Sequence, residues 1–169
     1  MKTFIIALTI AIAMFTAVAE AKTTKYGNWR FVEETDKLTG QREAYIWADA
    51  TVKDSRYSYK EPSMGIKCDA LYFLDLDVLN DGNLNFRVDT MAKPKRQPGY
   101  RYEGHQGIEV SISNTKRFWS KYSKHFKRMI AGNKIIVRFN SWGRDGQTIE
   151  VPLNGFTQAI TSLASACSI

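Results

Sequence analysis

The chain has 169 residues, of which 44% are hydrophobic, and it carries a formal net charge of +7 at pH 7. This length and composition exclude an intrinsically disordered chain and favour one domain that buries about 70% of its unfolded surface. The positive charge favours an acidic protein, an anionic glycan or a lipid headgroup as partner, although surplus charge can also serve solubility alone.

Residues 1–21 have the pattern of a secretory signal peptide. Lys2 precedes an apolar run from Phe4 to Val18, and a frame of small residues ends at Ala21. The run is shorter than the ~20 residues of a membrane span, so we expect cleavage after Ala21 rather than a retained anchor. Residues 22–169 would then form a single domain in the periplasm or outside the cell. No later segment is apolar enough to span a membrane, and nucleic acid is not an expected partner there.

Alternating apolar and polar residues predict strands in the first half of this domain. Residues 28–50 are expected to form two strands around a turn. Residues 70–89 have the same alternation on both sides of Asn80-Asp81-Gly82, which we interpret as a three-residue hairpin loop. This register places Asp75 opposite Arg87 on the outer face of the predicted hairpin.

Residues 90–107 form a stretch rich in proline, glycine and basic residues, and it is too long for a simple connection. Such a loop is expected to be either functional or disordered. Cations alternate with tyrosines in it, a mixture that can bind anions and stack on sugars or bases. The candidate binding residues of this loop are Lys93, Lys95, Arg96, Tyr100, Arg101 and Tyr102.

A short strand at residues 108–113 leads into a predicted amphipathic helix that ends at Gly132. One side of the helix is apolar and aromatic, from Phe118 to Ile130. The other side is almost entirely basic and includes the candidate binding residues Lys121, Lys124, Lys127 and Arg128. The helix can therefore be an ordinary packed helix with a solvated basic face, or a surface that contacts acidic partners or anionic lipid.

The chain ends with a predicted hairpin at residues 134–153 and a helix behind Asn154, a predicted N-cap. The apolar residues of this helix recur with helical spacing up to Cys167, which places its thiol on the inward face. Cys68 lies at the entrance to a predicted long strand. Two cysteines in an exported chain favour an internal disulfide over an intermolecular bridge or two free thiols. The predicted fold is therefore a β-rich α+β domain: an antiparallel sheet or sandwich of about seven strands, carrying a basic amphipathic helix, a C-terminal helix and one disulfide.

Several short motifs resemble a group of bacterial periplasmic proteins that includes invasion-associated locus B proteins and type VI secretion-associated proteins. They are NW at residues 28–29, the DKLTG turn, IKC ending at Cys68, FRVD at residues 86–89, and the ending LNGFTQAITSLASAC. The resemblance implies a disulfide-bonded periplasmic β-rich domain that serves the envelope, a secretion machine or host interaction. It carries over only Cys68 and Cys167, as a structural pair, and implies no catalytic residues.

Candidate catalytic and metal-binding patterns are outweighed by structural explanations. Ser113 and Lys116 match the S-x-x-K motif of penicillin-binding enzymes, but the companion motifs are absent, so Ser113 is expected to lie at or near a helix cap. His105 and His125 are expected on the surface, without a nucleophile beside them. The carboxylates of Asp75, Asp77 and Asp89 are explained by a solvated sheet face. We predict no catalytic residue, no metal site and no cofactor.

These observations favour a non-enzymatic binding or accessory protein of the bacterial envelope, which contacts an acidic partner or envelope component through the basic helix and loop. A secreted effector that acts on host or competitor surfaces is the alternative. An envelope hydrolase is less favoured because no catalytic constellation is present.

Overall fold

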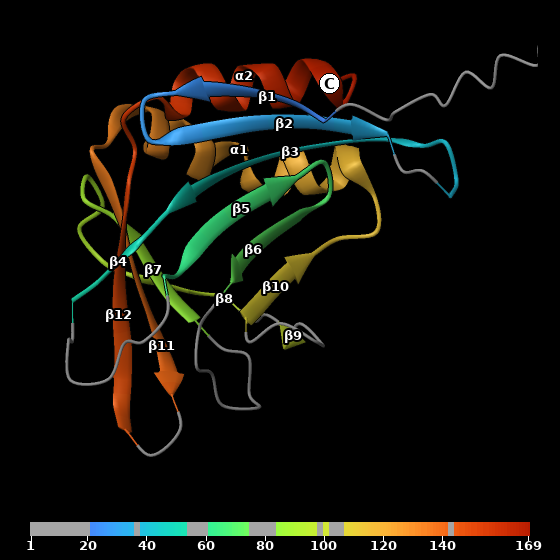
Figure 1. The fold of residues 1–169 in the computed structure, drawn as a ribbon. Coiled ribbons are helices and arrows are strands. Elements are labelled where there is room, and N and C mark those ends of the chain that lie inside the picture. The colour runs from blue at the N-terminus through green and yellow to red at the C-terminus, as the bar shows by residue number, and fades with distance from the viewer. Residues whose placement is uncertain are drawn as a thin grey trace, which may run out of the picture.

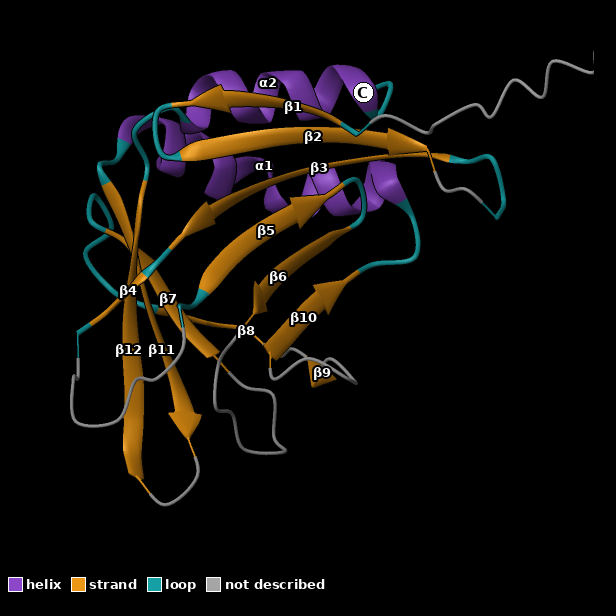
Figure 2. Ribbon diagram, viewed as in Figure 1, coloured by secondary structure: helices purple, strands orange, loops and turns teal. Residues whose placement is uncertain are grey.

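The computed structural model describes residues 21–35, 38–53, 61–74, 84–97, 100–101, 107–141 and 144–169. Within these ranges the chain forms twelve strands and two helices, and the strands make two antiparallel sheets (Figures 1 and 2). The β-rich α+β fold with two helices is confirmed. The predicted signal peptide, apart from Ala21, lies outside the described residues.

The larger sheet has seven strands. In spatial order they are β1 (Lys22–Tyr26), β2 (Trp29–Thr35), β3 (Arg42–Asp49), β5 (Ser63–Lys67), β6 (Ala70–Leu74), β10 (Gly107–Ser111) and β9 (Tyr100–Arg101). The smaller sheet has five strands. In spatial order they are β4 (Thr51–Val52), β12 (Arg144–Pro152), β11 (Lys134–Ser141), β7 (Leu84–Val88) and β8 (Lys95–Gln97).

The two helices, α1 (Thr115–Ala131) and α2 (Phe156–Ala166), contact each other and cover the inner face of the larger sheet (Figure 2). Alternation along the strands explains this, because Ile46 and Ala48 of β3 and Ile66 of β5 are fully buried while their neighbours face outward. One continuous core joins these residues to the apolar stripes of both helices and to the inner face of β7, β11 and β12.

The predicted pair of strands at residues 28–50 is confirmed as β2 and β3, with Trp29 opposite Ala48. The predicted hairpin at residues 70–89 is wrong. β6 pairs with β5 and β10 in the larger sheet, whereas β7 pairs with β11 and β8 in the smaller one, and Arg87 lies opposite Ile136. Alternation specifies which face of a strand is buried but not which strand lies beside it. The predicted loop and Asp75 lie outside the described residues.

The prediction of about seven strands was too low. The strand predicted to begin near Cys68 is a hairpin instead, in which β5 and β6 are joined by Cys68 and Asp69. β1 lacks an alternating apolar pattern, and β4, β8 and β9 have two or three residues each. Such strands form because a neighbouring strand offers unpaired backbone groups. Their own sequence therefore has no pattern that predicts them.

α1 begins and ends as predicted. The Asn114 side chain accepts a hydrogen bond of 2.9 Å from the backbone N–H of Arg117, and Gly132 is the C-cap. The buried stripe, however, includes His125, which is only 6% exposed, and leaves Ile130 47% exposed. The expectation of a surface position for His125 was therefore wrong. Positions 118, 122, 125 and 129 follow the helical repeat, so the centre of the stripe passes through residue 125.

α2 does not begin with the predicted cap at Asn154. Gly155 is the N-cap, with a φ of 88°, and no side chain caps the helix. This left-handed residue packs against the carbonyl of Tyr26, where any Cβ would overlap the backbone. The backbone N–H of Asn28 also donates a 3.0 Å hydrogen bond to the carbonyl of Asn154, so the β1–β2 turn holds the start of α2 in place.

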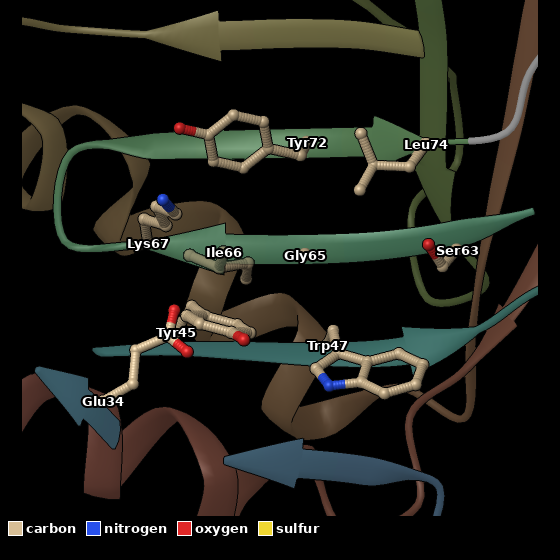
Figure 3. A pocket seen from close by; sticks show the side chains of 9 residues that line it. All are labelled: Glu34, Tyr45, Trp47, Ser63, Gly65, Ile66, Lys67, Tyr72 and Leu74. Atoms are coloured by element: carbon tan, nitrogen blue, oxygen red, sulfur yellow. The ribbon is translucent and has the colours of Figure 1, made fainter. Parts of the chain in front are cut away.

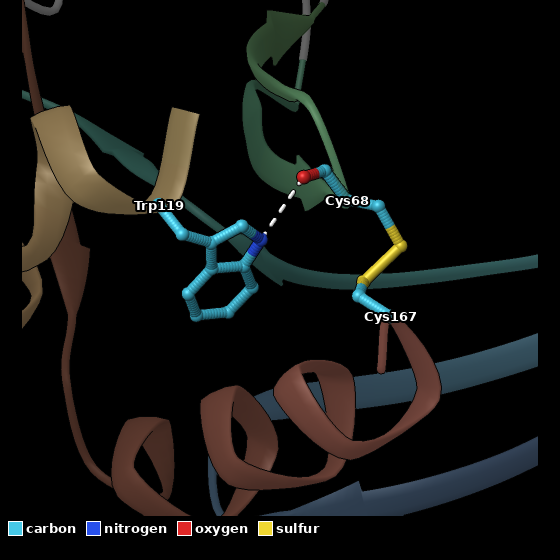
Figure 4. The surroundings of a disulfide bond; sticks show 3 residues. All are labelled: Cys68, Trp119 and Cys167. Atoms are coloured by element: carbon cyan, nitrogen blue, oxygen red, sulfur yellow. Dashed lines mark hydrogen bonds between the residues drawn. A yellow bond between two sulfur atoms is a disulfide. The ribbon is translucent and has the colours of Figure 1, made fainter. Parts of the chain in front are cut away.

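The predicted disulfide between Cys68 and Cys167 is confirmed, with a Cα–Cα distance of 5.6 Å (Figure 4). It joins the β5–β6 turn to the C-cap of α2. The indole N–H of Trp119 in α1 donates a 2.9 Å hydrogen bond to the carbonyl of Cys68, so three elements meet at this bond. The two cysteines therefore have a structural role.

Candidate binding surfaces

The basic face of α1 is exposed to solvent and carries no acidic counter-charge from its own first turn. Lys121, Lys124 and Lys127 are exposed, and Arg128 is half-buried. The ion pairs in the described part of the chain do not include these four residues. They join residues of β2, β3, β5, β11 and β12, and Lys53 beside β4. The sequence-predicted helix residues are thus gathered on one accessible face.

The predicted basic loop reaches this helix through Lys95 of β8. Lys95 lies opposite Phe86 in the register with β7, and the Phe86 ring lies 5.0 Å from the ring of His125. Burial, followed by the charges of Lys95, Arg128 and Lys124, lowers the pKa of His125. Two features that are separate in the sequence therefore meet at one buried side chain. We call Lys95, Lys121, Lys124, Lys127 and Arg128 the basic surface.

The other loop residues do not all join the basic surface. Arg96 lies opposite the exposed residue Asn85, so its side chain is on the other face of the sheet from Lys95. Lys93 is exposed just before β8. The backbone of Tyr100 and Arg101 forms β9 at the edge of the larger sheet, in register with β10. The candidate residue Tyr102 lies outside the described residues.

A second surface, which sequence reasoning missed, lies on the outer face of the larger sheet. A pocket of about 440 Å³ opens over β3, β5 and β6 (Figure 3). Its lining consists of Glu34, Tyr45, Trp47, Ser63, Gly65, Ile66, Lys67, Tyr72 and Leu74. The signal in the sequence was the pair of aromatic residues that alternates with buried Ile46 and Ala48, but its outward direction could not be assigned before the neighbouring strands were known.

The aromatic rings of this pocket are flanked by charges of both signs. The guanidinium of Arg30 lies 4.1 Å from the ring centroid of Trp47. The ammonium of Lys67 lies 5.9 Å from the ring centroids of both Tyr45 and Tyr72 and is bonded to Glu43 at 3.0 Å. Partial burial raises the pKa of Tyr45; the carboxylates of Glu34 and Glu43 add to this rise, and the ammonium of Lys67 opposes it.

Ser113 and Asp89, which were considered as candidates for catalysis or metal binding, lie at structural positions next to α1. Ser113 is exposed immediately before the Asn114 cap, near the helix start as expected. The carboxylate of Asp89 accepts hydrogen bonds of 3.1 Å from the backbone and side-chain amides of Asn133, which fixes the turn after α1. Slight desolvation alone would raise the pKa of Asp89, but these bonds outweigh it and lower the pKa. The described residues contain no group of three metal-ligating side chains.

In the described part of the chain, no helix is both long and apolar enough to cross a membrane. No family model and no curated protein matches the sequence. Among solved structures, the crystal structure of invasion associated protein b from Bartonella henselae matches with a TM-score of 0.54 and 14% sequence identity, over 88% of this chain and 99% of that chain.

The chain shares the fold of invasion associated protein b. This likeness confirms the resemblance expected from the short motifs, at the level of the fold. The elements that carry those motifs, including β2, the β5–β6 turn, β7 and α2, form the framework of the domain.

Proposed function

We propose that this protein is an exported, non-enzymatic binding or accessory protein of the bacterial envelope, and that its basic surface contacts an acidic partner. The observation that carries the proposal is that Lys95 of β8 meets the basic face of α1 at His125. Phe86, which lies opposite Lys95, has its ring 5.0 Å from that of His125, and the charges of Lys124 and Arg128 act on the same histidine. The partner is an acidic protein, an anionic glycan or a lipid headgroup, because each of these offers the negative charge that the surface lacks.

The arrangement of charges on α1 opposes the stability of the helix. Lys116 and Arg117 lie in its first turn, where the helix dipole favours acidic residues by about 0.3–1 kcal/mol each. Lys124 has like-charged neighbours three or four positions away at Lys121, Lys127 and Arg128, and each such pair costs about 0.2–0.5 kcal/mol. A solvated face needs no such concentration of one sign, so the energetic cost supports a binding role.

The fold likeness favours one alternative. The name of the structural neighbour associates that protein with invasion, so a secreted factor that acts at host or competitor surfaces through the same basic surface is the second candidate. Finding the protein in the culture medium rather than the periplasm would favour this alternative.

The test compares two double charge reversals in co-purification from native envelope extract. Lys121→Glu with Lys124→Glu removes charge from the basic surface, whereas Lys25→Glu with Arg42→Glu changes the net charge equally on β1 and β3. We expect the first variant to lose the captured partner and the second to keep it, and we expect capture by the wild type to fall as salt is raised.

The same reversal has a predicted effect on stability. Because new glutamates would face the remaining lysines and arginines of α1, the Lys121→Glu and Lys124→Glu variant should be more stable than the wild type by about 1 kcal/mol in urea unfolding. Loss of the partner from a better-folded protein would assign the loss to the surface itself. Equal capture by both variants would contradict the proposal.

A further inference from the structure

The pocket on the outer face of the larger sheet has no part in the proposed function. The strands β3, β5 and β6 contribute alternate residues whose side chains stand on the same face, and Glu34 of β2 completes this side of the lining (Figure 3). Ile66 also lines the pocket, but its side chain is buried in the core on the other face of the sheet. The inner face of these strands packs on the core that includes the stripe of α1. The pocket and the basic surface are therefore on opposite sides of the larger sheet, and a ligand in one would not contact the other.

Gly65 gives the pocket its open floor. It lies in register between Trp47 of β3 and Tyr72 of β6. A Cβ at this position would meet the carbonyl oxygen of Ile46 at 3.5 Å, the Trp47 Cβ at 3.9 Å and the Tyr72 Cβ at 4.0 Å, which are ordinary contacts. Packing does not require glycine here, and glycine weakens a strand interior. Its effect is to leave room for a ligand to reach the backbone between two aromatic rings.

The charges around the pocket indicate which ligands fit. Arg30 already covers the ring of Trp47, and Lys67 already lies between Tyr45 and Tyr72, so the protein's own cations occupy positions that a cationic ligand would need. An anion would meet the carboxylate of Glu34 in the lining. An uncharged ligand avoids both conflicts.

The remaining groups favour a ligand with both polar and apolar faces. Aromatic rings present a negative π face, to which the weakly positive C–H groups of a sugar ring are attracted. The hydroxyls of Ser63 and Tyr45 and the carboxylate of Glu34 line the same pocket and can hydrogen-bond sugar hydroxyls. A volume of about 440 Å³ is near the lower end of the ~300–1,000 Å³ typical of small-molecule sites.

From this geometry we propose that the pocket is a binding site for an uncharged saccharide, of mono- or disaccharide size, which lies over Gly65 with Trp47 on one side and Tyr72 on the other. The site is independent of the basic surface. A chain with both would hold an uncharged glycan segment on one side and an acidic partner on the other.

The test titrates the intact, oxidised protein with a panel of uncharged disaccharides, namely cellobiose, maltose, xylobiose and N,N′-diacetylchitobiose, and follows binding by calorimetry and by amide chemical shifts in NMR spectra. We expect saturable binding of at least one of them, with shifts concentrated in β3, β5 and β6. Absence of saturable binding across the panel, or shifts elsewhere, would overturn the assignment.

Two variants locate the site. Gly65→Val should weaken binding at least tenfold because it fills the floor, and it should not impair folding because valine favours strands and its Cβ would make only ordinary contacts. Trp47→Ala should weaken binding similarly by removing a ring. The Lys121→Glu and Lys124→Glu variant serves as the control and should bind as the wild type does, so this site and the basic surface can fail separately. Affinity unchanged in both pocket variants would contradict the proposal, as would an unstructured peptide that binds at these residues when no saccharide does.

Discussion

His125 is a buried histidine that faces cations on two elements. Its ring lies 5.0 Å from that of Phe86 and 5.9 Å from that of Tyr122, and no hydrogen-bond partner of its Nδ1 is found among the described residues. Desolvation and the cations from α1 and β8 act in the same direction, since both disfavour the imidazolium form and lower the pKa of His125. The unfolded chain has neither effect, so its histidine keeps a pKa near 6.5.

A pH dependence of stability follows from this difference. Below about pH 6.5 the histidine of the unfolded chain binds a proton, whereas folded His125 stays neutral down to its lower pKa. The free energy of unfolding should therefore be highest above pH 6.5 and decrease as the pH falls from there towards the folded pKa. The carboxylates with lowered pKa, Asp89 and Glu150, act in the same sense only at more acidic pH. Urea unfolding between pH 7.5 and pH 5 should show a decrease in the wild type and a smaller one in His125→Phe. Identical slopes would show that His125 does not contribute.

At the scale of elements, α2 is held by its neighbours rather than by its own sequence. No side chain caps its first turn, and neither end carries a charge that favours the helix dipole. Instead, Gly155 packs against the carbonyl of Tyr26, and the ring of Phe156 lies 5.0 Å from that of Trp29 in an edge-to-face contact. The Trp29 indole N–H also donates to the carbonyl of Pro152 at 2.9 Å.

A pair of glycine substitutions tests this junction. Gly155 and Gly40 both have a left-handed backbone, with φ of 88° and 69°, but a Cβ at Gly40 would meet no atom within 4 Å. Gly40→Ala should therefore cost only the left-handed conformation, about 1–2 kcal/mol. Gly155→Ala should cost more than about 3 kcal/mol because overlap with the backbone of Tyr26 adds to the same term. Similar losses in calorimetric melting would contradict the proposed tight contact.

Some parts of the fold that depend on residues close together in the sequence were predicted correctly. The end of α1 at Gly132 and its start next to Ser113 were expected, and β2 with β3 follows from alternation around a turn, whereas the cap predicted at Asn154 was wrong. The partner of β7 was not predictable in this way, because the alternation from Leu84 to Val88 suits β6 and β11 equally well. The buried position of His125 was missed because a histidine was expected on the surface, although position 125 lies on the apolar stripe of the helix.

The same distinction between local patterns and strand order applies to the basic surface and the pocket. The cations of α1 could be placed from helical spacing alone, because one helix face is a local property. Their proximity to Lys95 depends on the pairing of β7 with β8, and the pocket depends on the order β3, β5 and β6. Both arrangements come from strand order, which short-range patterns do not contain.

At the scale of the whole molecule, the short motifs NW and FRVD and the two cysteines lie where distant segments meet. The NW motif contacts the start of α2, the FRVD motif ends at Asp89, which fixes the turn after α1, and the cysteines join the β5–β6 turn to the end of the chain. These contacts hold the two helices on the larger sheet. The candidate binding residues lie on the basic face of α1, on β8 and over the outer face of the sheet, where they can vary without disturbing the framework.

The disulfide is the covalent contact in this framework, and it joins residues 99 positions apart. Loop closure of that length is worth about 4.7 kcal/mol in the chain-entropy model, a large share of the ~5–15 kcal/mol of an ordinary domain. The Cys68→Ala and Cys167→Ala double variant should lose stability of this order in urea unfolding.

The loss should also be uneven along α2. At its start, the contacts of Gly155 and Phe156 with the β1–β2 turn remain in the double variant, and buried Leu163 stays in the core. The residues beyond Leu163 keep only hydrogen bonds within the helix and its last turn. Amide hydrogen exchange should therefore accelerate more at residues 164–167 than at residues 159–160, beyond the general effect of lower stability. Uniform acceleration along the helix would mean that α2 leaves the sheet as one unit, and that the disulfide holds the whole helix rather than its last turn.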